Sequence, residues 1–297
     1  MDNKRVGLIG VGLLGSALAE RMHQGGFVVS GYDVNWTYFD QQQRERPELA
    51  ATVAKTASAN QLASDHDTIV MCLPDSAAVE NAIGGFEQKL RPGALIIDAT
   101  TGDPDTAEQI AARLASLQRS YVDATIAGSS QQARQGEAVV IVGGGDRDVG
   151  RASAVLESWS SRRFHVGAAG SGQRMKLVVN LVLGLNRAVL AEGLNLAQSA
   201  SINPASALEV LKATPAYSTA MDTKGAKMVN RDYAVQARLS QHLKDVTLIR
   251  ALGRRSGAAT PLSDVHEELL RLAANAGFGD ADNSAIMEAY ARRKTNR

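Results

Sequence analysis

The sequence of 297 residues holds a single cysteine, Cys72, so no disulfide can form within the chain. Such cysteine usage is typical of a reducing compartment, and we expect a cytoplasmic protein. The chain also has no excess of charge of one sign, because 32 basic residues stand against 31 acidic ones for a net charge of +1. This balance gives no indication of a nucleic-acid partner or of an anionic membrane surface.

Long hydrophobic runs are missing as well. No stretch of about twenty apolar residues is free of polar interruption, so we expect no membrane span. The first residues lead directly into a strand predicted at residues 6–9, which leaves no room for the apolar core of a signal peptide. No internal repeat or low-complexity tract is found. The composition is that of a globular protein, and the length favours two domains.

A glycine-rich segment follows the first predicted strand and reads Gly10-Val11-Gly12-Leu13-Leu14-Gly15. In this pattern the first glycine permits a tight turn, the second lets the backbone approach a pyrophosphate, and the third lets a helix pack closely on the strand. The N-terminus of the helix offers free N–H groups to the diphosphate. We therefore expect a dinucleotide site here.

An acidic residue completes this pattern. A second strand, predicted at residues 27–32, ends at Asp33, 18 residues after Gly15. A carboxylate at this place accepts hydrogen bonds from the adenosine ribose and repels a 2′-phosphate. The expected cofactor is therefore NAD, with NADP as the alternative.

Apolar runs and helical patterns continue to alternate through the first half of the chain. The alternation predicts an α/β fold, a Rossmann-type doubly wound, mainly parallel sheet with helices on both faces. Further strands are expected at residues 68–73, 94–98, 121–123, 138–142 and 163–166, and helices at residues 16–22, 36–46, 60–64, 76–83 and 104–117.

The second half is predicted to be all-helical. Apolar side chains surround the segment from residue 171 to about residue 200 on nearly all sides, so we expect a long central helix buried on most of its faces. Lys176 and Asn180 are four residues apart and lie on one face of this helix. Further helices are expected from Pro204 and at residues 239–256, 261–276 and 283–293. The predicted domains are residues 1–167, which bind the dinucleotide, and residues 168–297, for substrate and dimerisation.

Four blocks of sequence, in this order, resemble the β-hydroxyacid dehydrogenases, the family of 3-hydroxyisobutyrate dehydrogenase and tartronate semialdehyde reductase. They are residues 10–15, residues 123–129, residues 170–180 and Lys244-Asp245. The third block, with its glycines, lysine and asparagine at fixed spacing, is the most specific. The resemblance covers nearly the whole chain. It implies an oxidoreductase that transfers a hydride between NAD(P) and a small 3-hydroxy acid.

The resemblance also implies roles for individual residues. Lys176 matches the catalytic lysine, which acts as general acid and base. The matched cofactor contacts are Gly10, Val11, Gly12, Leu13, Leu14, Gly15, Asp33, Leu73, Pro74, Ala78, Thr101 and Lys244. The matched substrate contacts are Ala127, Gly128, Ser129, Asn180 and Asp245. No metal is implied. Because the second half is apolar, burial against a second subunit is expected, in a homodimer or homotetramer.

The second block departs from the family pattern, Asp-Ala-Pro-Val-Ser-Gly-Gly. Thr125 stands in place of the proline, Ala127 in place of the serine and Ser129 in place of the second glycine. In the family this loop grips the substrate carboxylate through the serine hydroxyl and backbone amides. Ala127 has no hydroxyl, so the grip depends on the N–H groups around Gly128 and Ser129 and on the Ser129 hydroxyl.

Several alternatives remain open at this point. An imine reductase shares the architecture but usually lacks the lysine, and a 6-phosphogluconate dehydrogenase would have a histidine where this chain has Val179. A dinucleotide-binding protein without turnover is a further alternative. Lys176 itself has a structural alternative, since a lone lysine in an apolar stretch is commonly a surface residue whose head reaches solvent.

Other polar residues are assigned no chemistry. Cys72 is expected to fill space in a buried strand, and the segment Asp65-His66-Asp67 is expected to be a solvated turn. His23, His165, His242 and His266 are scattered along the sequence.

Overall fold

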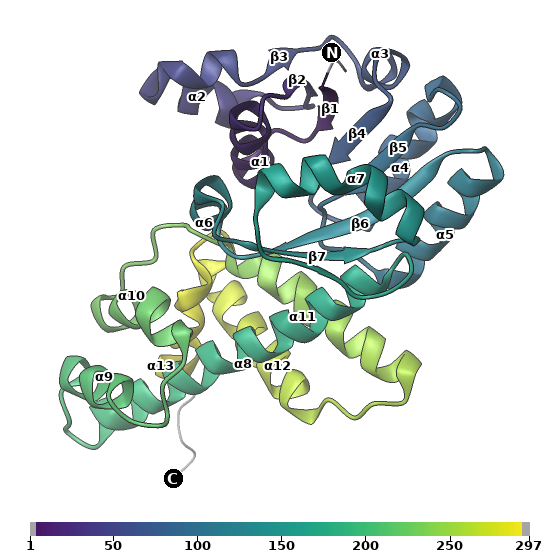
Figure 1. Ribbon diagram of the computed structural model, residues 1–297. Coiled ribbons are helices and arrows are strands. Elements are labelled where there is room, and N and C mark those ends of the chain that lie inside the picture. The colour runs from purple at the N-terminus through teal and green to yellow at the C-terminus, as the bar shows by residue number, and fades with distance from the viewer. Residues whose placement is uncertain (1–3, 293–297) are drawn as a thin grey trace. The chain divides into compact units, whose positions relative to one another are not determined.

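One sheet organises the N-terminal part of the computed structural model, which describes residues 4–292 (Figure 1). The strand order is β3-β2-β1-β4-β5-β6-β7-β8. The strands are β1 (Arg5–Ile9), β2 (Val28–Tyr32), β3 (Ala54–Lys55), β4 (Thr68–Met71), β5 (Leu95–Asp98), β6 (Ser120–Ala127), β7 (Val139–Gly143) and β8 (Arg163–His165). All neighbouring strands run parallel except β6 and β7. The predicted doubly wound, mainly parallel sheet is therefore confirmed.

The inner strands of the sheet are buried on both faces, and successive side chains of each strand point to opposite sides. In β5, Leu95 and Ile97 join one apolar cluster, whereas Ile96 joins the other. The first cluster is covered by α1 (Leu13–Gln24) and α7 (Asp146–Trp159), and the second by α3 (Ala59–Asp65), α4 (Ser76–Phe86) and α5 (Pro104–Ser116). The remaining helices of this part are α2 (Thr37–Glu45), α6 (Ser130–Gln135) and the 3-10 turns η1 (Pro47–Ala51) and η2 (Glu87–Lys89).

The structure corrects the prediction for residues 123–129. The segment was expected to be a loop beyond residue 123, but β6 continues to Ala127. Thr125, in place of the family's proline, keeps its N–H and pairs with Ile141 of the antiparallel β7. A proline is poorly tolerated inside a sheet because it cannot donate to the ladder, so this replacement suits a continuous strand.

Contacts divide the chain into two compact units, residues 1–176 and residues 177–297. The long helix α8 (Ser171–Ser199) begins in the first unit and continues into the second. The second unit is helical: α9 (Pro204–Lys212), η3 (Met221–Gly225), α10 (Ala226–Asn230), α11 (Leu239–Ser256), α12 (Pro261–Ala273), η4 (Ala274–Phe278), η5 (Asn283–Ile286) and α13 (Met287–Arg292). Its core is built around Leu190, Ala191 and Leu194 of α8.

The expectation that α8 is buried on most of its faces is wrong. Its bounds match the prediction, but a row of apolar side chains is open to solvent in the single chain. The row consists of Val178, Val182, Val189 and Leu196, and Leu183 is exposed on another face of the helix. Among the described residues, α8 is also the one helix long and apolar enough for a membrane span, a property it shares with core helices of soluble proteins.

Candidate cofactor and catalytic site

The glycine-rich segment forms a tight turn between β1 and α1. Gly10 has φ +93°, and a Cβ there would lie 2.2 Å from the carbonyl oxygen of Cys72. A Cβ at Gly15 would lie 2.0 Å from the carbonyl oxygen of Gly10, so the separate roles predicted for these two glycines are confirmed. Apart from Gly12 itself and its two neighbours in the chain, no atom lies within 4 Å of the position a Cβ would take at Gly12. The turn is therefore open on the side where a ligand must approach the backbone.

Asp33 lies beside this turn at the end of β2. Its Oδ2 accepts a hydrogen bond from the Val11 N–H at 2.6 Å, and its Oδ1 accepts one from the Asn35 N–H at 2.8 Å. Helix α1 begins at Leu13 without a side-chain cap, so the N–H groups of its first turn, Leu14 included, are left for a ligand. An open turn, an uncapped helix start and a fixed carboxylate together fit a nicotinamide dinucleotide.

The other predicted cofactor contacts of this unit follow β4, which lies next to β1, and β5, which lies next to β4. The Leu73 N–H donates to Thr100 Oγ1 at 3.0 Å, which joins the segments that hold Leu73, Pro74 and Thr101. Ala78 lies in the first turn of α4, where its N–H donates to Asp75 Oδ1 at 2.9 Å. Because these strands are parallel, the sheet brings these residues and the glycine-rich turn to its carboxyl edge, where doubly wound sheets bind ligands.

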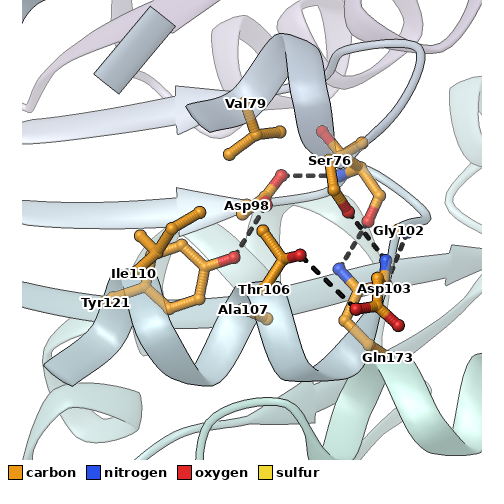
Figure 2. A pocket seen from close by; sticks show the side chains of 11 residues that line it. Ser76, Val79, Asp98, Gly102, Asp103, Thr106, Ala107, Ile110, Tyr121 and Gln173 are labelled. Carbon is orange, nitrogen blue, oxygen red and sulfur yellow. Dashed lines mark hydrogen bonds between the residues drawn. The ribbon is translucent and has the colours of Figure 1, made fainter. Parts of the chain in front are cut away.

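A small polar cavity lies at the same edge (Figure 2). Ser76, Asp98, Tyr121 and Gln173 are among its lining residues, and the Tyr121 hydroxyl donates to Asp98 Oδ2 at 2.7 Å. Burial raises the pKa of Asp98. The space open to the centre of a water molecule is about 10 Å³, which is enough for one water and far below the volume of a substrate site.

The predicted substrate contacts of the first unit lie where β6 ends. Ala127 is the last residue of the strand, and Gly128 has φ +153°. Ser129 then begins α6 in a capping box: its hydroxyl accepts from the Gln132 N–H at 3.1 Å, and its own N–H donates to Gln132 Oε1 at 2.9 Å. The Ser129 amide is therefore occupied, and its remaining donor is the hydroxyl proton.

Lys176 is the last residue of the first unit, and only 8% of its surface is exposed. The alternative of a surface lysine is thus wrong. The start of its helix is held by the buried Asp123 of β6. Asp123 Oδ1 accepts from the Gly170 N–H and Oδ2 from the Gln173 N–H, both at 2.8 Å. Burial raises the pKa of Asp123 to about 6, although these two hydrogen bonds lower it.

The helical unit brings together three of the predicted residues. Asn180 of α8 donates from Nδ2 to Asp245 Oδ2 of α11 at 2.8 Å, and both side chains are buried. The Lys244 ammonium lies 3.3 Å from Asp245 Oδ1. The predicted site residues thus form two sets, one in each unit, with Lys176 at the junction of the two units in sequence.

The structure corrects the prediction for His66. His66 is buried and contacts Leu62 O and Ser30 Oγ, so this residue does not belong to a solvated turn. His242 and His266, which are separated in the sequence, come together in the structure, where their rings lie 5.1 Å apart between α11 and α12. Cys72 was expected inside a buried strand, but β4 ends at Met71 and Cys72 follows it, half-buried. The expected inert role still fits, since the surrounding protein raises the pKa of its thiol to about 12.

Asp123 and Gln173 were missed as functional candidates, although both lie inside the sequence blocks that carry the resemblance. Their hydrogen bonds join segments 47 to 73 residues apart, which no local pattern records. The sequence signal that could have identified Asp123 and Gln173 is a polar residue at a position expected to be buried, because buried polar groups are normally hydrogen-bonded.

Comparison with known proteins relates both halves of the chain to NAD-binding domains of dehydrogenases. The NAD binding domain of 6-phosphogluconate dehydrogenase matches residues 5–167, and the NAD-binding domain of NADP-dependent 3-hydroxyisobutyrate dehydrogenase matches residues 170–290. The 3-hydroxyisobutyrate dehydrogenase from Salmonella typhimurium superposes with a TM-score of 0.86 at 26% identity, covering 96% of this chain and 99% of that one.

The similar curated proteins differ in what their names describe. The cytokine-like nuclear factor N-PAC of Homo sapiens is 27% identical over 292 residues, which cover 97% of this chain and 52% of that protein. This chain thus spans about half the length of the first such relatives. The 2-(hydroxymethyl)glutarate dehydrogenase of Eubacterium barkeri is 27% identical over 294 residues, 96% of this chain and 94% of that protein.

An imine reductase from Pseudomonas sp. shares the fold, with a TM-score of 0.63 at 20% identity over 97% of this chain and 99% of that one. The two family models together cover nearly all the described residues, in the same order as the Rossmann-type and helical parts of the structure. The chain belongs to the β-hydroxyacid dehydrogenase family, and its N-terminal domain is an NAD(P)-binding domain.

Proposed function

We propose that this protein transfers a hydride between NAD(P) and a small 3-hydroxy acid of the 3-hydroxyisobutyrate or tartronate semialdehyde kind, with Lys176 as general acid and base. The observation that carries the proposal is the buried position of Lys176 at the start of α8, in a chain that also holds an open glycine-rich turn. The nicotinamide of a bound cofactor would accept or supply the hydride.

Lys176 would handle the proton that accompanies this hydride. In the oxidation, its neutral amine accepts the hydroxyl proton as the carbon gives up hydride and becomes a carbonyl. In the reduction, its ammonium protonates the oxygen as the carbonyl carbon gains hydride. Negative charge on that oxygen is greatest near the transition state, so a cation beside it lowers the barrier more than it stabilises the ground state.

The cofactor would be held by the glycine-rich turn, by Asp33, by the residues after β4 and β5, and by Lys244. NAD is the preferred form because the Asp33 carboxylate is fixed at the end of β2 and would repel a 2′-phosphate. The substrate would contact Ala127, Gly128, Ser129, Asn180 and Asp245, with the carboxylate grip reduced to the Ser129 hydroxyl and the backbone around Gly128.

The exposed apolar row of α8 supports a homo-oligomer, a dimer or a tetramer, in which a second copy covers this row. Residues 1–167 would form the cofactor domain and residues 168–297 the substrate and dimerisation domain of a cytoplasmic enzyme.

The test is turnover of the purified chain with NAD or NADP and a panel of small 3-hydroxy acids, followed by nicotinamide absorbance. Replacing Lys176 with Ala should lower kcat by about 10²-fold or more while the Kd for NAD stays within about twofold. Lys89→Ala, which removes an exposed lysine, is the control and should leave both unchanged. Equal losses of turnover and NAD binding in Lys176→Ala would show that the lysine is structural.

Two competing functions are decided in the same assay. A dinucleotide-binding protein without turnover is kept because N-PAC is named as a nuclear factor rather than as an enzyme. It predicts NAD binding with no oxidation of any 3-hydroxy acid in the panel. An imine reductase predicts faster reduction of cyclic imines than of 3-oxo acids, and the buried lysine argues against it.

A further inference from the structure

We propose that Asp123 and Gln173 form a clamp that fixes the first turn of α8 to the carboxyl edge of the sheet and thereby positions Lys176. The proposal rests on the proposed role of Lys176 in proton transfer. Both residues would be positioning residues, since neither is placed among the groups that contact the reacting atoms.

Asp123 acts as the N-terminal cap of α8 from a distant part of the sequence. Gly170 precedes the helix and has no side chain to cap it. Asp123 accepts hydrogen bonds from the Gly170 and Gln173 N–H groups, the two donors that a capping box normally satisfies. A carboxylate beside a helix N-terminus also interacts favourably with the helix dipole. The cap is therefore supplied by β6 and ties the helix directly to the sheet.

The backbone around Asp123 leaves room for nothing larger than this carboxylate. A Cβ at Gly143 would lie 2.5 Å from Asp123 Oδ1, and a Cβ at Gly172 would lie 2.6 Å from Oδ2. The carboxylate is 0% exposed, and burial of a carboxylate is costly. An apolar side chain would fill the same space without the desolvation cost of a carboxylate, but it could not accept the two hydrogen bonds. These two hydrogen bonds are therefore the role of the carboxylate.

Gln173 ties the same turn to the segment after β5. Its Oε1 accepts from the Gly102 N–H at 2.9 Å, and its Nε2 donates to the Thr100 carbonyl at 2.8 Å. Figure 2 shows the Gln173 side chain directed into the polar cluster that also holds Asp98 and Ser76. Thr100 in turn accepts the Leu73 N–H, so the start of α8 is linked to the segments that follow β4 and β5.

Lys176 follows Gln173 by three residues, so the two lie on the same side of the helix within one turn. A helix rises about 1.5 Å per residue, and a misplacement of about 1 Å in a catalytic group costs roughly 10²-fold in rate. The position of the first turn of α8 therefore has to be fixed to within less than the rise of one residue. The clamp provides four hydrogen bonds to this turn, two from Asp123 and two through the Gln173 side chain.

The variants Gln173→Met and Asp123→Asn keep the side-chain volume and remove hydrogen bonds. We expect kcat to fall at least about tenfold in each, with KM and the Kd for NAD within about threefold of wild type. Ser58→Ala removes the N-cap of α3 and is the matched control: it should lower stability by about 1 kcal/mol without changing kcat. The proposal would be overturned if a control destabilised by the same amount lost as much kcat as Gln173→Met or Asp123→Asn, because the loss of kcat would then follow from the loss of stability alone.

A second measurement separates positioning from general damage. In the Lys176→Ala background, with added methylamine as the proton carrier, Gln173→Met should have no further effect on the rate, because the group it positions is gone. Independent, multiplying effects in this cycle would overturn the positioning role.

Hydrogen exchange tests the clamp without any activity. Amides of residues 170–176 should exchange about tenfold faster in Gln173→Met and Asp123→Asn than in wild type, and should not change in Ser58→Ala. Unchanged exchange overturns the clamp. A wild-type chain without turnover on any substrate would overturn the proposed function and the catalytic consequence of the clamp, while the exchange result would still decide whether the clamp exists.

Discussion

The backbone N–H of Ser129 donates to Oε1 of Gln132 at 2.9 Å, and the Gln132 N–H donates to the Ser129 hydroxyl at 3.1 Å. This reciprocal pair begins α6 and occupies the Ser129 N–H, one of the donors expected to face a substrate carboxylate, while the proton of the Ser129 hydroxyl stays available. Together with Ala127 in place of the family's serine, it leaves the end of β6 with few donors. In the proposed function, a substrate acid would therefore be held more weakly at this end of the site than the family pattern implies.

Ala127→Ser should restore part of this grip. One hydrogen bond to a charged acceptor contributes about 1.5–3 kcal/mol, so the KM of a 3-hydroxy acid should fall about tenfold with little change in kcat. Ala127→Cys is the matched control, since the thiol has similar size and is a weak donor. Steady-state kinetics of the three proteins on one acid checks this, and equal effects of Ser and Cys would mean that packing alone is responsible.

The outcome at β6 shows what local sequence patterns can predict and what they cannot. Gly10 and Gly15 could be assigned separate tasks because their spacing encodes one local turn, and the bounds of α11 follow from helical periodicity and from Gly257. β3 was missed because it is two exposed residues long and shows no apolar pattern. The extension of β6 to Ala127 depends on its pairing with β7, a partner that the segment itself does not specify.

The features of the site that local patterns could not predict depend on contacts between distant segments. Asn180 and Asp245 were both expected in the site, but only the packing of α8 against α11 joins them at 2.8 Å. The roles of Asp123 and Gln173 could not be predicted, since a cap supplied from 47 to 50 residues away leaves no trace in local spacing. The pair of His242 and His266 likewise exists only because α11 and α12 pack side by side.

Asp33 should determine the choice of cofactor. Asp33→Asn keeps an oxygen for the Val11 N–H and removes the charge that repels a 2′-phosphate. The ratio of the Kd for NADP to the Kd for NAD should fall by about tenfold or more, a change of about 1.4 kcal/mol. Fluorescence titration with both cofactors measures it. Equal weakening of both would show that Asp33 only supports the turn. The control is Asp40→Asn, which removes a half-buried carboxylate of α2 that forms an ion pair with Lys55.

Gly184 should not tolerate a side chain. A Cβ there would lie 2.4 Å from His242 Nε2 and 2.6 Å from His266 Cε1, two rings that cannot both move within a packed core. Overpacking of this kind costs about 1–3 kcal/mol, so Gly184→Ala should lower the free energy of unfolding by that amount. On the same helix, a Cβ at Gly193 meets nothing within 4 Å, and Gly193→Ala should raise stability by about 0.5–1 kcal/mol. Urea unfolding measures both, and a stabilised Gly184→Ala would contradict the packing described here.

The buried Asp123 carboxyl should make stability depend on pH with an unusual sign. Burial raises its pKa from 3.8 to about 6, so between these values the folded protein keeps a proton that the unfolded chain has released. Its contribution to the free energy of unfolding is therefore present at low pH and is lost as the pH rises through about 6. The full difference is about 3 kcal/mol, because one pKa unit corresponds to 1.36 kcal/mol.

Asp123→Asn removes this titration and isolates it from the other groups that titrate in the same range. Burial lowers the pKa of His266 to about 4, which gives the opposite dependence on pH, and this contribution cancels when the variant is subtracted from wild type. Burial also raises the pKa of Asp98, whose charge raises the pKa of Asp123 in turn, so the subtraction reports Asp123 together with its repulsion from Asp98. The stability of wild type relative to Asp123→Asn should fall by up to about 3 kcal/mol between about pH 4 and pH 6 and stay constant above it. Urea unfolding across this range measures the difference. A difference that is flat, or that rises with pH, would mean that the carboxyl is ionised throughout and that its two hydrogen bonds to α8 outweigh its burial.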